Sequence, residues 1–133
     1  MRKALSLLCV ALTAACALAT EPGTAPLDRE FGVREGEQVV VDEGMLTVRF
    51  LEVADDSRCP TGAQCVWAGE GVVVLRLART GSEPAEVTLR TTPGKESGTY
   101  EGYGVVLRKL DPHPRAGGSP PETYRATLEV RRR

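Results

Sequence analysis

The sequence has a single histidine, His113, and few aromatic residues, which make up 5% of its 133 residues. A catalytic triad and most zinc sites need a histidine that neighbouring groups hold in place. His113 lies between two prolines in an expected exposed loop, where nothing is expected to fix it. The chain also lacks a Gly-x-Ser-x-Gly elbow, a phosphate-binding loop and a zinc motif. We therefore expect no enzymatic activity, no catalytic residues, no cofactor and no metal site.

Neither sign of charge is in excess, because 17 basic residues stand against 18 acidic residues for a net charge of −1. No basic surface for nucleic acid is expected, so nucleic acid is not an expected partner. The longest apolar run, residues 4–15, is too short to cross a membrane, since about twelve helical residues rise only about 18 Å. A basic start, a short apolar run and small residues after it are typical of an export signal.

Two cleavage points are compatible with this signal. The stretch "LTAAC" ending at Cys16 resembles a bacterial lipobox, which would make residues 1–15 the signal peptide and Cys16 a lipidation site. This predicts an outer-membrane or cell-envelope lipoprotein that touches the membrane only through its lipid. The alternative is ordinary signal peptidase cleavage after Ala19, which predicts a periplasmic or secreted protein.

The remainder divides into an expected flexible tether and one domain. Residues 16–36 contain prolines, glycines and charges without periodicity, which is typical of a linker. Residues 37–133 are expected to form a single β domain and a monomer. Alternation of apolar and polar residues predicts strands over 37–43, 45–56, 71–80, 85–92, 103–112 and 124–131.

No helical stripe follows the signal, and turn residues recur every ten or so positions. This spacing predicts an all-β fold, namely an antiparallel β-sandwich of about six to seven strands with immunoglobulin-like architecture. A small β-barrel is the alternative.

The segment "DSRCPTGAQCVWAGE" holds Cys59 and Cys65. Pro60 favours extended backbone at Cys59 and Gly62 allows a reversal, so we expect the two cysteines to form a structural disulfide. A redox pair is disfavoured, because such pairs use Cys-x-x-Cys at a helix start. A metal site would need two further ligands.

Trp67 follows Cys65 by two residues, so in a strand both would point to the same side. We expect its indole to pack over the disulfide and cap the core. An exposed platform for a sugar or peptide is the alternative. Asp55, Asp56 and Glu70 could hold Ca²⁺ only if their loops converge, and their spacing matches no calcium motif.

This cysteine–tryptophan stretch resembles the hallmark S-R-C-P-x-x-x-x-C-x-W-A-G of a family of small bacterial exported proteins and lipoproteins of unknown function. The similarity spans roughly Val40 to Val130. It implies an exported, disulfide-bearing β domain and assigns no activity to any residue. The matching residues are Ser57, Arg58, Cys59, Pro60, Cys65, Trp67, Ala68 and Gly69.

Three functions are compatible with these expectations. The first is an envelope-anchored or secreted binding or structural module, whose partner would be an envelope protein or polysaccharide. The second is an inhibitor of a secreted hydrolase that presents the loop Cys59–Cys65. The third is a carrier of a small ligand or metal ion. The candidate binding loop comprises Arg58, Pro60, Thr61, Gly62, Ala63, Gln64, Trp67 and Gly69.

Overall fold

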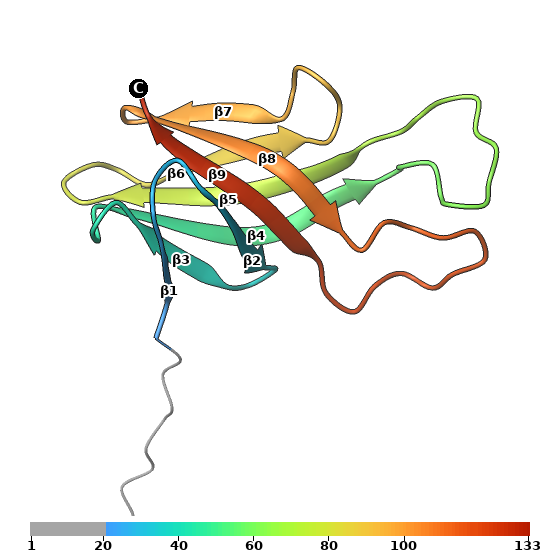
Figure 1. The fold of residues 1–133 in the computed structure, drawn as a ribbon, viewed down its shortest axis with the longest axis horizontal. Helices are drawn as coiled ribbons and strands as arrows, with labels where there is room; N and C mark the ends of the chain where they lie inside the picture. The colour runs from blue at the N-terminus through green and yellow to red at the C-terminus, as the bar shows by residue number, and fades with distance from the viewer. Residues whose placement is uncertain (1–20) are drawn as a thin grey trace, which may run out of the picture.

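The computed structural model describes residues 21–133, which form strands and no helix (Figure 1). The predicted signal peptide and the predicted lipidation of Cys16 lie outside the described residues. Within residues 21–133 we find no helix long and apolar enough to span a membrane. The strands are β1 (Gly23–Ala25), β2 (Glu30–Arg34), β3 (Gln38–Val41), β4 (Leu46–Asp56), β5 (Gly71–Arg79), β6 (Ala85–Arg90), β7 (Ser97–Tyr100), β8 (Tyr103–Asp111) and β9 (Arg125–Arg132).

The strands form two packed sheets, and the predicted all-β sandwich is confirmed. One sheet has the order β1-β3-β4-β5-β6 and the other β2-β9-β8-β7. All pairings are antiparallel except the parallel pair β1–β3. The two sheets do not close into a barrel. Strands β3 to β6 and β7 to β9 follow one another as meanders, which differs from the Greek key of immunoglobulin domains.

The core lies between the sheets and follows the alternation that the sequence shows. In β4, the side chains of Leu46, Val48 and Phe50 are fully buried, and in β5 so are those of Leu75 and Leu77. Each such side chain stabilises the fold by about 1.5–3 kcal/mol, because it leaves water. All six predicted strands are present.

The predicted tether is wrong from Gly23 onward, and the domain begins before residue 37. Strand β1 pairs with β3, and β2 pairs with β9 along its whole length. Val33 of β2 is fully buried and Phe31 packs against the core. Both are short edge strands. Strand β1 is only Gly-Thr-Ala, and β2 carries Glu30 and Arg34, charges that discourage pairing with other chains. That composition made them look like a linker.

Strand β7 was also missed, because it contains Gly98 and only four residues. A Cβ on Gly98 would lie 2.4 Å from Val87 Cγ1, so β7 packs tightly over β6 where the two sheets meet. The four edge strands are short, from three residues in β1 to six in β6. Little sheet edge is therefore available for pairing with another chain.

Candidate functional site

Two long connections lie together at one end of the sandwich (Figure 1, right). Residues 57–70 join β4 to β5 and are called the disulfide loop; residues 112–124 join β8 to β9 and are called the proline loop. Their main chains are bonded, since Thr61 N donates to Pro114 O at 2.9 Å and Ala116 N donates to Thr61 O at 3.0 Å. The two loops therefore form one surface, called the loop end.

Arg58 fixes the base of the disulfide loop to the rest of the loop end. Its guanidinium forms a bidentate pair with Asp56, at 2.7 and 2.8 Å. It also donates to the carbonyls of Leu110 at 2.6 Å and Pro112 at 2.8 Å. Arg58 is buried, so this residue of the predicted binding loop is unavailable to a partner.

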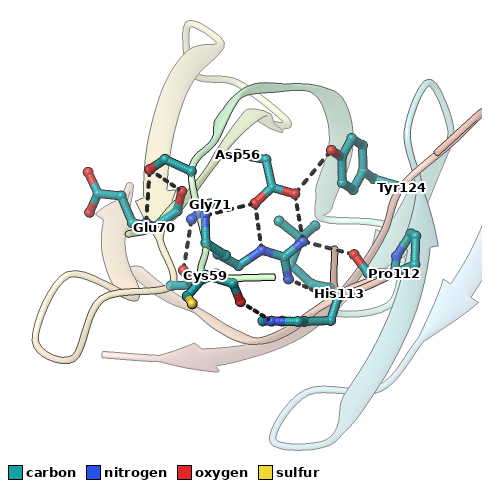
Figure 2. A network of polar contacts seen from close by, with 11 residues as sticks. Asp56, Cys59, Glu70, Gly71, Pro112, His113 and Tyr124 are labelled. Atoms are coloured by element: carbon teal, nitrogen blue, oxygen red, sulfur yellow. Dashed lines mark hydrogen bonds and ion pairs between the residues drawn. The ribbon is translucent and has the colours of Figure 1, made fainter. Parts of the chain in front are cut away.

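The carboxylate of Asp56 is saturated with donors (Figure 2). Besides Arg58, the hydroxyl of Tyr124 donates to its Oδ2 at 3.1 Å. Burial raises the pKa of Asp56, but the Arg58 hydrogen bonds and charge, together with Tyr124, outweigh it, so the pKa lies below its usual value. For Tyr124, burial and then the bond to Asp56 raise the pKa.

This lowered pKa predicts a pH-dependent contribution to stability. Because the folded pKa of Asp56 lies below the unfolded one, the contribution is complete above the unfolded pKa of about 4 and is lost as pH falls through the folded pKa. We expect the gap in unfolding free energy between wild type and Asp56→Asn to be constant above about pH 5 and to shrink below about pH 4. Urea unfolding over a pH series measures it. A gap that does not change with pH would contradict the ion pair.

The predicted disulfide between Cys59 and Cys65 is confirmed, with a Cα–Cα distance of 5.9 Å. Cys59 is held on both sides: its N–H donates to Ala68 O at 2.9 Å, and its carbonyl lies 2.9 Å from Nε2 of His113, which donates to it. The expectation that nothing fixes His113 is therefore wrong. The histidine fastens the proline loop to the disulfide loop (Figure 2).

These contacts predict that the disulfide shapes the loop but is not needed for folding. Replacing both Cys59 and Cys65 with serine opens a closed loop of about seven residues, which should cost about 2–2.5 kcal/mol of unfolding free energy. The hydrogen bonds of Cys59 N and of Arg58 do not depend on the disulfide. Circular dichroism and urea unfolding should show a folded, less stable protein. An unfolded double variant would contradict this division of roles.

Gly69 allows the two sides of the disulfide loop to meet at its base. Its φ is +65°, and a Cβ there would lie 1.7 Å from the carbonyl oxygen of Ser57. Next to it, Ser57 N donates to Glu70 O at 2.8 Å and Glu70 N donates to Ser57 Oγ at 3.1 Å. Gly69 therefore has a structural role at the base of the disulfide loop rather than a role in contacting a partner.

Val66 and Trp67 are exposed at the tip of the disulfide loop. Their relative exposures are 93% and 82%, and every residue from 61 to 69 is exposed. The prediction that Trp67 packs over the disulfide is wrong, because this segment is not a strand and alternation does not apply. The alternative, an exposed platform, describes the position of Trp67. Two adjacent large apolar side chains left in water point to an interaction site.

The exposure of Trp67 has a direct spectroscopic consequence. Since it is the only tryptophan, its fluorescence should be quenched by acrylamide almost as strongly in the native protein as in urea. Trp67→Ala should change the unfolding free energy by no more than about 0.5 kcal/mol. Strong protection from the quencher, or a loss of several times that energy, would show that the indole is packed.

A hollow of about 520 Å³ lies beneath the proline loop. Its lining includes Asp56 and Tyr124, Pro60 and residues 112–121. Its volume is typical of ligand-binding pockets. The polar groups of Asp56 and Tyr124 are bonded to each other, so what remains for a ligand is the proline-rich wall together with Arg115 and Ser119.

Two of the three acidic residues considered for Ca²⁺ are bonded to other side chains. Glu70 pairs with Arg90 and accepts from Thr92 Oγ1 at 2.6 Å. The Thr92 hydrogen bond and then Arg90 lower the pKa of Glu70 more than burial raises it. Asp56 is engaged by Arg58 instead. Among residues 21–133, no group of three or more His, Cys, Asp or Glu is arranged to hold a metal ion.

No protein family, curated protein or solved structure matches this chain. The resemblance to the cysteine–tryptophan hallmark stays a prediction. Among the described residues, the loop end is the strongest candidate for a functional site. In the sequence, Cys59, Cys65 and Trp67 indicated this region. Sequence reasoning missed Val66 and the proline loop, because a lone valine and a turn-rich segment carry no distinctive pattern.

Proposed function

We propose that this protein is an exported binding module, anchored to the cell envelope or secreted, that has no catalytic site and contacts its partner through the loop end. The observation that carries the proposal is the exposed pair Val66 and Trp67 on a loop with a fixed base. Tryptophan is the residue type most enriched among those that dominate binding energy.

The bonds that hold the disulfide loop in shape support this role. Binding through a mobile loop loses conformational entropy, whereas a loop already held in shape loses less. Here the disulfide, Arg58, His113 and the Ser57–Glu70 bonds all hold the loop before any partner arrives. The short sheet edges offer a partner less than this end does.

Inhibition of a secreted hydrolase is a second candidate. The observation that favours it is that Trp67 does not pack on the disulfide, so the closed loop stands clear of the core and could enter an active-site cleft. In that case the exposed turn from Gly62 to Gln64 would contact the enzyme together with the tip.

The binding role can be tested with the single tryptophan itself. Trp67 is the single tryptophan of the sequence, so the chain labelled with 5-fluorotryptophan gives one fluorine resonance, that of Trp67. We expect this resonance to broaden when envelope extract is added and to recover when unlabelled wild-type protein competes. Unlabelled Trp67→Ala should not compete. Equal competition by both proteins would contradict binding through the loop end.

Export and anchoring need a separate measurement. The intact mass of the mature protein from its native host should show a lipid-bearing chain that begins at Cys16, or a chain that begins at Thr20 if the alternative holds. Alkylation of Cys59 and Cys65 should require prior reduction. An unprocessed chain that begins at Met1 would contradict export.

A further inference from the structure

We infer that the partner is a protein, and that Val66 and Trp67 insert together into a concave apolar pocket on its surface. This inference rests on the proposed binding role of the loop end. Its alternative, a polysaccharide stacked on the indole, is an outcome of the test below.

The first observation is the neighbour of the tryptophan. A sugar ring stacks on an aromatic face and needs hydrogen-bonding groups around it, and Val66 provides neither. At 93% exposure, Val66 gains from binding only if it leaves water for an apolar surface. Apolar pockets of that kind are provided by proteins rather than by polysaccharides.

The second observation is that the hydroxyl and the two carboxylates at the base of the disulfide loop are already bonded within the molecule. The hydroxyl of Ser57 donates to Glu70 O at 3.2 Å and accepts from Glu70 N. The carboxylates of Asp56 and Glu70 are held by Arg58 and Arg90. Carboxylates are effective acceptors for sugar hydroxyls, and these two are not free. Thr61 and Gln64 are the polar side chains exposed between the cysteines, and both are uncharged.

The third observation is the shape of the disulfide loop. It extends beyond the ends of β4 and β5 (Figure 1), and its residues 61–69 are exposed without interruption. A projecting loop fits a concave surface, where its apolar tip can be surrounded and dehydrated. A flat polysaccharide surface would leave most of the tip in water.

The tip alone is smaller than a stable interface, which usually buries about 1,600 Å² in total. The proline loop extends the contact surface, because Thr61 and Ala116 bond the two loops together. The hollow beneath the proline loop can receive a protruding side chain of the same partner.

The test places a photoreactive benzoylphenylalanine at position 64 of the full chain, where the exposed Gln64 lies beside the inserting pair without belonging to it, and irradiates the protein in the envelope of its native host. The matched control carries the same group at Glu83, an exposed position beyond β5 at the opposite end of the sandwich. We expect one discrete protein adduct from position 64 and none from position 83. In a Trp67→Ala background the adduct should weaken at least about tenfold, as for a residue that dominates binding.

The site on the partner is identified by mass spectrometry of the cross-linked peptide. Support requires that this peptide line a concave apolar pocket and that the adduct depend on Trp67. A polysaccharide or lipid adduct that depends on Trp67 would overturn the inference while leaving the binding role intact. Labelling no stronger than that of the control position would overturn both.

Discussion

Replacing Arg58 with alanine is expected to lower the free energy of unfolding by about 3–5 kcal/mol. The substitution leaves the Asp56 carboxylate without its counter-ion and removes the donors to the carbonyls of Leu110 and Pro112. Uncompensated buried charges and unpaired carbonyls are costly because water cannot reach them. Urea unfolding, followed by far-ultraviolet circular dichroism, measures the loss.

Arg49→Ala is the matched control. Arg49 is exposed on β4, and no ion pair to it is found among residues 21–133, so its loss should change stability by no more than about 0.5 kcal/mol. Arg58→Lys should fall between the two, because lysine keeps the charge but cannot form the bidentate pair. Similar stabilities for Arg58→Ala and Arg49→Ala would contradict the role of Arg58 as the fixed base of the loop.

Gly69→Ala is expected to cost more than about 3 kcal/mol, the range of severe substitutions. The left-handed backbone disfavours any side chain, and the new Cβ would overlap the carbonyl oxygen of Ser57, which is main chain and can move only if the Ser57–Glu70 hydrogen bonds break. Thermal and urea unfolding measure the cost.

Gly81→Ala separates the two causes. Gly81 also has a positive φ, of +82°, but a Cβ there meets nothing within 4 Å. Its substitution should therefore cost only the conformational penalty, about 1–2 kcal/mol. Equal costs at positions 69 and 81 would show that the close approach at the base of the disulfide loop is absent.

The sequence predicted the core strands well because burial on one face imposes a period of two. Val48 and Phe50 alternate with Arg49 in β4, and the structure places them as that alternation requires. The edge strands β1 and β7 are too short to show this alternation, and in β2 it extends over only five residues. Each of the three contains a glycine. Strand β2 depends on pairing with β9, which is distant in the sequence, whereas β7 forms a hairpin with β8.

The sequence predicted the disulfide of the candidate site correctly, but it placed Trp67 and Arg58 incorrectly. The disulfide follows from Cys59, Cys65 and the turn between them, all of which are local. The exposure of Trp67 and the burial of Arg58 depend on how the disulfide loop meets the proline loop, across about fifty residues of sequence. A bidentate arginine that binds carbonyls from another strand leaves no local pattern, so Arg58 could not be distinguished from an exposed loop residue.

The proposed function requires that the loop end, rather than a sheet edge, contacts the partner. Amide hydrogen exchange of the full chain, with and without envelope extract, tests it over the whole domain. We expect extract to slow exchange in residues 61–69 and in the proline loop, and to leave the edge strands β1, β2, β6 and β7 unchanged. Slower exchange confined to those edge strands, with none at the loop end, would contradict the claim.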